Sequence, residues 1–268
     1  MPNTKANGIE IHYEINGSGL PLVLIAGLGY PAWEWHKMLP FLSKHFKVIT
    51  YDNRGVGLTE TPAGPYTASL LAADLAGLLD SLGIDQAIVM GHSMGGFIAQ
   101  AFALEYPSRL NRLVLCSTNF GGPNHVPISA EAMTVLSDIS SDPLTRFKKG
   151  LVVSTAPGFA DKHSEIIQDW LDWRLANPIN GPGYQAQMAI GLGLISPEAS
   201  FEPKLHHITV PTLILFGAHD KVVPPANADL LAKEIFGSTI FILPDAGHFF
   251  PIETPQAAAE AVIRFISE

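Results

Sequence analysis

A serine stands between two glycines where a short apolar run meets a helix-like segment. The run is Ala87-Ile88-Val89-Met90, the junction is Gly91-His92-Ser93-Met94-Gly95-Gly96, and the helix-like segment is Phe97 to Tyr106. A chain that passes directly from a buried strand into a helix must bend sharply, and glycine on both sides of the serine leaves room for that bend. On its own the pattern also fits an ordinary loop serine. Its context predicts a nucleophile elbow that presents the Ser93 hydroxyl at the edge of a sheet.

Apolar runs alternate with helix-like stretches along most of the chain. The segment Gly8 to Ile15 alternates apolar and polar residues, which is typical of a half-exposed strand, whereas continuous runs are typical of buried strands. The other continuous runs are Leu22–Ala26, Val48–Tyr51, Leu113–Cys116, Thr212–Phe216 and Thr239–Leu243. The helix-like stretches are Tyr66–Leu82, Phe97–Tyr106, Ala226–Ile235 and Pro255–Ile266. This order predicts an α/β fold with a mainly parallel, doubly wound sheet and helices on both faces.

One segment interrupts this rhythm. Between Ser117 and Thr212 lie about ninety residues without a convincing strand, far more than a crossover needs. We therefore predict an inserted helical cap over residues 121–208, with the core formed by residues 1–120 and 209–268. The insertion leaves the carboxyl end of a strand, where parallel sheets bind ligands, so we expect it to lie over the elbow as a lid.

Composition excludes several classes of partner. The chain has 268 residues, a net charge of −9 and no cluster of Lys and Arg, which argues against binding to nucleic acid. The first residues lack the apolar core of a signal peptide, and no apolar run approaches the ~20 residues of a membrane span. We expect a cytoplasmic protein that binds neither nucleic acid nor membranes.

Two further residues follow strand-like runs and complement the serine. A serine hydroxyl is a weak nucleophile unless a base takes its proton, and a third group must orient that base. Asp220 lies on a loop after the Thr212 run, and His248 lies on a glycine-bearing loop after the last run. The chain order Ser93, Asp220, His248, each after a strand, is associated with one particular fold. We predict that these three residues are the catalytic residues.

On these residues the chain resembles the α/β-hydrolase superfamily, in particular its branch of capped carboxylesterases and 3-oxoadipate enol-lactonase-like proteins. The resemblance covers nearly the whole length, and the segments that carry it are Gly91–Gly96, Asp52-Asn53-Arg54-Gly55-Val56-Gly57, Gly217-Ala218-His219-Asp220 with Pro224, and Gly247-His248. It implies that Ser93 is the nucleophile, His248 the base and Asp220 the group that orients it. It also implies an acyl-enzyme intermediate.

Such a reaction needs two backbone N–H groups aimed at the developing oxyanion. We expect one from Met94, which follows the nucleophile at a helix N-terminus. The resemblance implies that Leu28, in Ala26-Gly27-Leu28-Gly29, supplies the other. The family commonly has histidine where this chain has Ala26. Backbone donors do not depend on that side chain, but what holds the loop in place is left open.

Most other polar candidates have simpler interpretations. The His92 ring should point away from Ser93 because the two residues are adjacent on a bent turn, and His219 is expected to pack within its loop. Asp245 is a rival acid, but it lies only three residues before the histidine base and is typical of a turn. The pair His206-His207 does not predict a metal site, because adjacent side chains usually diverge and no Cys or carboxylate stands at ligand spacing.

The remaining candidates are aromatic or structural. Trp170 and Trp173 are spaced i, i+3 in the insertion, and we take Trp170 and Phe249 as candidate substrate-pocket residues, although aromatic side chains also serve simply as packing groups. Asp52 and Arg54 are expected to hold their glycine-bearing loop by charge-assisted hydrogen bonds.

The sequence therefore predicts a cofactor-free, metal-free serine hydrolase of esters or lactones of small, fairly apolar acids. Two other reactions use the same three residues, hydrolysis of carbon–carbon bonds and perhydrolysis. A slow-turnover ligand receptor with this fold is an alternative of another class. Dehalogenases and epoxide hydrolases also resemble this chain, but they use aspartate as the nucleophile, so Ser93 argues against both. The expected partner is a small ester or lactone, and the natural substrate and oligomeric state stay open.

Overall fold

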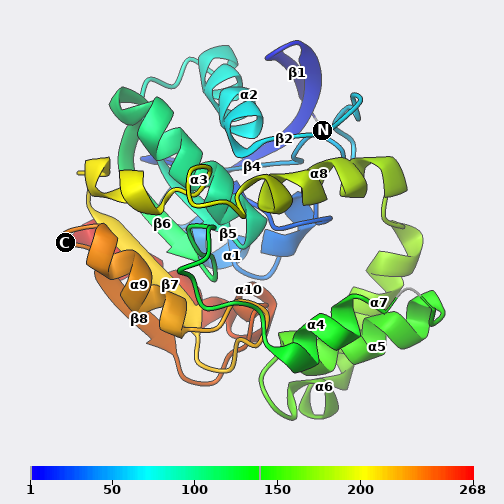
Figure 1. The fold of residues 1–268 in the computed structure, drawn as a ribbon. Coiled ribbons are helices and arrows are strands. Elements are labelled where there is room, and N and C mark those ends of the chain that lie inside the picture. Colours follow the sequence, from blue (N-terminus) through cyan, green and yellow to red (C-terminus); the bar gives the residue numbers. More distant parts are fainter. Residues whose placement is uncertain (1, 139) are drawn as a thin grey trace.

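An eight-stranded sheet forms the centre of the computed structural model, which describes residues 2–138 and 140–268 (Figure 1). The strands are β1 (Asn3–Ala6), β2 (Ile9–Asn16), β3 (Pro21–Ile25), β4 (Lys47–Tyr51), β5 (Ala87–His92), β6 (Leu110–Cys116), β7 (Thr212–Gly217) and β8 (Thr239–Leu243). Their spatial order is β1-β2-β4-β3-β5-β6-β7-β8. The pairs β1–β2 and β2–β4 are antiparallel, and all other neighbours are parallel. The predicted mainly parallel sheet is confirmed, and β1 is an additional strand that we did not predict.

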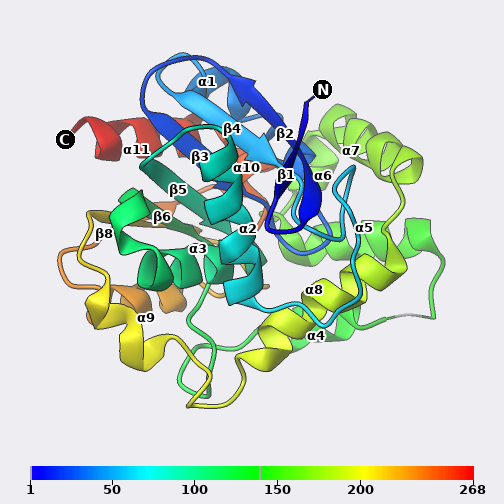
Figure 2. The same cartoon turned by 90° about the horizontal axis from the view of Figure 1, so that it is seen from above.

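Helices cover both faces of this sheet, as predicted (Figure 2). The α-helices are α1 (Leu39–Leu42), α2 (Ala68–Ser81), α3 (Met94–Glu105), α4 (Ala130–Leu136), α5 (Pro143–Ser154), α6 (Phe159–Lys162), α7 (Ser164–Ala176), α8 (Gly181–Gly193), α9 (Ala226–Glu234), α10 (Phe250–Glu253) and α11 (Pro255–Ser267). Short 3₁₀ helices span Ala32–Trp35, Pro107–Arg109 and Glu202–His207. Side chains of α2, α3 and α9 pack on one face, and those of α1, α10 and α11 pack on the other. In the described residues, no helix has the length and apolar character that a membrane crossing demands.

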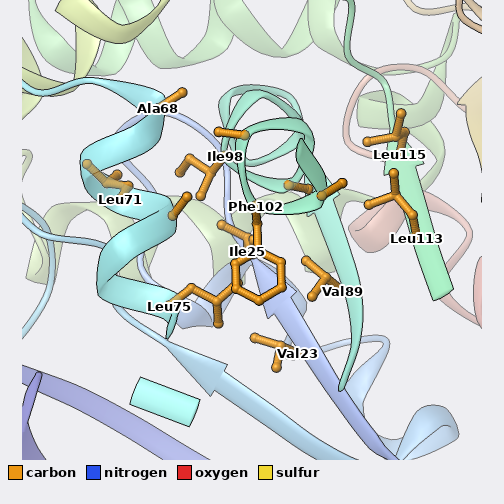
Figure 3. Packing of buried hydrophobic residues seen from close by; sticks show 14 of the residues in the cluster. Val23, Ile25, Ala68, Leu71, Leu75, Val89, Ile98, Phe102, Leu113 and Leu115 are labelled. Carbon is orange, nitrogen blue, oxygen red and sulfur yellow. The ribbon is translucent and has the colours of Figure 1, made fainter. Parts of the chain in front are cut away.

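The apolar runs provide the core because successive side chains of a strand point to opposite faces. Val23 and Ile25 of β3 face α2 and α3, whereas Leu22 and Leu24 belong to the cluster on the other face. Figure 3 shows the first of these layers, in which α2 and α3 pack on β3, β5 and β6 through Leu71, Leu75, Ile98, Phe102, Val23, Ile25, Val89, Leu113 and Leu115. Burial of one such side chain contributes about 1.5–3 kcal/mol. These two layers fix the carboxyl ends of the parallel strands, where the loops discussed below begin.

The last strand corrects one prediction. We expected Thr239–Leu243 to be buried, but Ile240, Phe241 and Ile242 are 36%, 37% and 38% exposed. β8 pairs only with β7 and therefore forms an edge of the sheet. A continuous apolar run predicted the strand correctly and its burial wrongly.

Between β6 and β7 the chain forms helices α4 to α8, and the described residues of this stretch contain no strand. Figure 1 shows α4 to α7 grouped to one side of the sheet, with α8 leading back towards α3. We call residues 121–208 the insertion. Its side chains and backbone reach the loops that follow β3, β4 and β8. These loops meet at the carboxyl edge of the parallel strands.

Candidate active site

Ser93 lies between β5 and α3 in a conformation that few residues adopt. Its φ is +54° and its ψ is −117°, a strained region that costs about 1–3 kcal/mol for a residue with a side chain. Neighbouring groups hold it there. The Ser93 N–H donates to the Cys116 carbonyl (2.9 Å), and the Ser93 carbonyl accepts from Gly96 N–H and Thr118 Oγ1 (2.9 Å each). The backbone therefore fixes the direction of the hydroxyl-bearing side chain.

The glycines on either side of Ser93 stand where no side chain fits. A Cβ on Gly91 would overlap the Gly95 carbonyl, and a Cβ on Gly95 would overlap the carbonyl of Ile25 at the end of β3. The helix thus begins in direct contact with two strands. This close approach is the physical reason for the pattern that the sequence displays.

Asp220 and His248 are brought together by the loops after β7 and β8. His248 Nδ1 lies 2.8 Å from Asp220 Oδ2, and both residues are buried. The other carboxylate oxygen of Asp220 accepts from the N–H groups of Val222 (2.9 Å) and Val223 (2.8 Å). An acceptor at Nδ1 places the proton there and leaves Nε2 free to act as a base. The rival Asp245 is exposed.

The loop Ala26-Gly27-Leu28-Gly29 lies against the serine. A Cβ on Gly27 would lie 3.4 Å from Ser93 Cβ. Gly27 N–H donates to Glu34 Oε2 (2.7 Å) and Gly29 N–H to Gln187 Oε1 (3.0 Å). The Leu28 N–H between them donates to no other described residue. The Leu28 N–H is one of the two donors that we predicted for the oxyanion. The other predicted donor belongs to Met94, which is the first residue of α3 and directly follows Ser93.

These contacts answer the question that Ala26 raised about how the loop is held. Asn53 Nδ2 donates to the Ala26 carbonyl (3.2 Å), and Arg174 Nη1 donates to the Gly29 carbonyl (3.3 Å). Together with Glu34 and Gln187, four side chains from outside this loop therefore hold it in place. None of them was predicted from the sequence. Glu34 had a local signal, since it is a carboxylate placed directly between two tryptophans, Trp33 and Trp35.

The ring of His92 is engaged on both sides and is fully buried. Its Nδ1 lies 2.7 Å from Glu34 Oε1, and its Nε2 lies 2.9 Å from the His248 carbonyl. Burial by itself would lower the pKa of His92, but the charge and hydrogen bond of Glu34, together with the hydrogen bond to the His248 carbonyl and the charge of Asp220, raise that pKa overall.

Glu253 is a second buried carboxylate that sequence reasoning missed. Both of its oxygens lie 3.0 Å from the Gly247 nitrogen, and Oε2 also accepts from Ala156 N–H (2.6 Å). Gly247 precedes His248, and Ala156 belongs to the insertion. Burial raises the pKa of Glu253 to about 7. The carboxylate therefore joins the insertion to the loop that carries His248.

Aromatic side chains fill the space between the Gly27 loop and the insertion. Trp170, buried in α7, packs edge-on against Phe249 with 4.8 Å between ring centroids. Trp33 stacks on Trp173 at 4.0 Å, and Tyr30 touches Phe249 at 5.2 Å. The two candidate pocket residues thus belong to one apolar cluster, next to His248.

The loop after β4 is built as predicted. Asp52 accepts from the N–H groups of Ala32 and Leu58 (2.8 Å each), and Arg54 forms a buried ion pair with Asp74 of α2.

We expected the side chains of His206 and His207 to diverge, but they do not: their ring centroids lie 3.9 Å apart. No group of three His, Cys, Asp or Glu side chains that could hold a metal occurs among the described residues.

Comparison with known proteins places these features in context. A family model described as alpha/beta hydrolase fold matches residues 21–255. The chain is 33% identical over 250 residues to 3-oxoadipate enol-lactonase 2 of Acinetobacter baylyi, covering 91% of this chain and 88% of that protein. It is 29% identical over 286 residues to 2-hydroxy-6-oxo-2,4-heptadienoate hydrolase of Pseudomonas putida, covering 98% and 94%. The solved enol-lactonase from Burkholderia xenovorans LB400 matches with a TM-score of 0.84 and 30% identity over 100% of both chains.

Proposed function

This chain belongs to the α/β-hydrolase family, in its enol-lactonase-like branch, and we propose that it is a cofactor-free serine hydrolase of carboxylic esters or lactones. The observation that carries the proposal is the buried hydrogen bond between His248 Nδ1 and Asp220 Oδ2, in a fold that holds Ser93 on a strained elbow. A histidine oriented in this way can activate a serine hydroxyl.

The reaction proceeds in two halves. Ser93 Oγ attacks the carbonyl carbon while His248 Nε2 accepts its proton, and Asp220 stabilises the imidazolium. The carbonyl oxygen becomes negative and accepts hydrogen bonds from the N–H groups of Leu28 and Met94. The tetrahedral intermediate collapses, the leaving alkoxide takes the proton from His248, and the acyl group stays on the serine. Water, activated by the same base, then releases the acid and restores the hydroxyl.

The surroundings favour an apolar acyl group. We assign residues 1–120 and 209–268 to the core and residues 121–208 to a cap, and the aromatic cluster that contains Trp170 and Phe249 lies where cap and core meet. Apolar walls with few polar groups are typical of sites for small organic molecules. The lactone named in the relative from Acinetobacter baylyi supports a cyclic or linear ester as substrate.

The test is turnover of p-nitrophenyl esters of graded acyl length and of a simple lactone, with Ser93→Ala alongside. We expect multiple turnovers in the wild-type protein and a loss on the order of 10⁶ in kcat in the variant, because losing the nucleophile removes the combined effect of all three residues. More than a trace of hydrolysis by Ser93→Ala refutes the assignment.

A second reaction is favoured by one relative. The acid in the name of the Pseudomonas putida hydrolase contains a ketone and no ester, so its hydrolysis breaks a carbon–carbon bond. Wild-type protein that leaves esters and lactones intact but cleaves such an oxo acid through Ser93 supports this alternative. Ligand binding without turnover of any of these compounds supports a receptor.

A further inference from the structure

We propose that Glu34 and His92 form a buried positioning pair that holds the oxyanion loop and the His248 loop in one fixed relation to Ser93. The proposal rests on the proposed function, since the atoms that it positions are those of the serine hydrolase reaction. Neither residue touches the reacting atoms in this mechanism.

Three hydrogen bonds run in series across the site. Gly27 N–H donates to Glu34 Oε2 (2.7 Å), Glu34 Oε1 meets His92 Nδ1 (2.7 Å), and His92 Nε2 meets the His248 carbonyl (2.9 Å). Glu34 and His92 are 0% exposed. One carboxylate and one imidazole therefore connect segments that lie far apart in the sequence.

The placement of protons makes this series directional. A carbonyl oxygen can only accept, so His92 Nε2 must carry a proton to bond the His248 carbonyl. The second proton, between His92 Nδ1 and Glu34 Oε1, is shared by the pair. With that proton on either partner, Glu34 Oε2 still accepts from Gly27. Because water does not reach the pair, removal of one member leaves the other without a partner in a buried site.

The positions that the pair fixes are those on which the chemistry depends. Gly27 precedes Leu28, whose N–H is the proposed oxyanion donor, and a Cβ on Gly27 would lie 3.4 Å from both His92 Nδ1 and Ser93 Cβ. At the other end, the carbonyl held by His92 belongs to the base itself. A displacement of about 1 Å can reduce a rate about 10²-fold, and loss of one oxyanion donor reduces kcat about 10²–10³-fold.

The isosteric change Glu34→Gln separates hydrogen bonding from charge. The Gln carbonyl can accept from Gly27 N–H while its amide donates to a neutral His92, so all three hydrogen bonds are kept. Glu34→Ala removes two of them. Asp80→Ala is the control, because it removes an ion-paired carboxylate whose partner Arg109 directly precedes β6, at the edge of the sheet opposite the site.

We would measure kcat and KM with p-nitrophenyl acetate. The concentration of competent enzyme is taken from the number of serines that react to completion with a fluorophosphonate, and kcat is expressed per such serine. Counting competent serines removes the contribution of misfolded protein. We expect kcat per competent serine to fall about 10²–10³-fold in Glu34→Ala with little change in KM, and to stay within about tenfold of wild type in Glu34→Gln and Asp80→Ala. A Glu34→Ala protein within tenfold of wild type overturns the proposal, as does an equal loss in Glu34→Gln.

A second measurement needs neither a variant nor turnover. In ¹⁵N-labelled wild-type protein, correlation spectra of the histidine rings report which nitrogens carry protons. We expect His92 Nε2 to be protonated from pH 5 to pH 9, and a deprotonated Nε2 overturns the pair even if Glu34→Ala fails to fold. Wild-type protein that hydrolyses no ester or lactone refutes the proposed function alone and leaves this spectrum as the test of the pair.

Discussion

Glu253 offers a test of electrostatics in the interior of this protein. Its hydrogen-bond donors are the backbone N–H groups of Gly247 and Ala156, and no basic side chain among the described residues forms an ion pair with it. Burial, assisted by the charge of Asp220, raises the pKa of Glu253 to about 7 from its ordinary value of 4.5, although the two N–H donors act in the opposite direction. Between pH 4.5 and about 7, Glu253 in the native state therefore holds a proton that it has already lost in the unfolded chain.

The size and sign of the effect follow from this difference. The contribution of protonated Glu253 to the free energy of unfolding is fully present below pH 4.5, where Glu253 is protonated in both the native and the unfolded state. This contribution is lost as the pH rises through about 7. A native pKa of about 7 against 4.5 corresponds to about 3 kcal/mol of unfolding free energy. Glu253→Gln removes this titration. We expect the free energy of unfolding of the variant, minus that of wild type, to increase by about 3 kcal/mol between pH 4.5 and pH 8.

Urea titrations of both proteins at a series of pH values measure this difference, because all other titrating groups are shared and cancel. Tryptophan fluorescence and circular dichroism should give coincident transitions, which licenses a two-state free energy. Glu105→Gln, at an exposed site, corrects for the general effect of removing one negative charge. A difference that stays constant or falls with rising pH refutes the reasoning, since it means that burial does not dominate over the two backbone donors.

Three further outcomes are expected. Gly95→Ala should lower the free energy of unfolding by about 1–3 kcal/mol, because its Cβ overlaps the last carbonyl of β3; Gly193→Ala, in open space, should not, and equal melting temperatures would contradict this. Asp220→Asn should reduce kcat about 10⁴-fold with an unchanged circular dichroism spectrum, because the His248 tautomer is no longer fixed; activity within tenfold of wild type would disprove that role. Trp170→Ala should lower the free energy of unfolding by about 3–5 kcal/mol and shift the preferred ester chain length. An unaltered chain-length preference would exclude Trp170 from the pocket.

Features encoded within a few residues could be predicted from the sequence. The elbow around Ser93 depends on glycines within three positions, and strands such as β3 and β5 are signalled by their own apolar runs. Burial of a strand depends on its neighbours, which the run itself does not reveal. Thr239–Leu243 is as apolar as the inner strands, yet its place after β7 at the edge leaves it without a second partner.

The groups that hold the site together could not be predicted in the same way. Glu34 is 58 residues from His92, and Gln187 is 158 residues from Gly29. Such pairs arise only when the whole fold is in place, and nothing near Gln187 distinguishes it from other polar positions on a helix. Glu34, between two tryptophans, is the case in which a local clue was present.

The contacts of the insertion limit how freely this protein could exchange parts with its relatives. Gln187 accepts the Gly29 N–H, Ala156 donates to Glu253, and α8 approaches the loop after β4 so closely that a Cβ on Gly183 would overlap Gly55. A chimera that received a foreign insertion would keep its own core but lose the partners of these groups. Transplanting substrate preference into this scaffold therefore requires matching changes in the core loops.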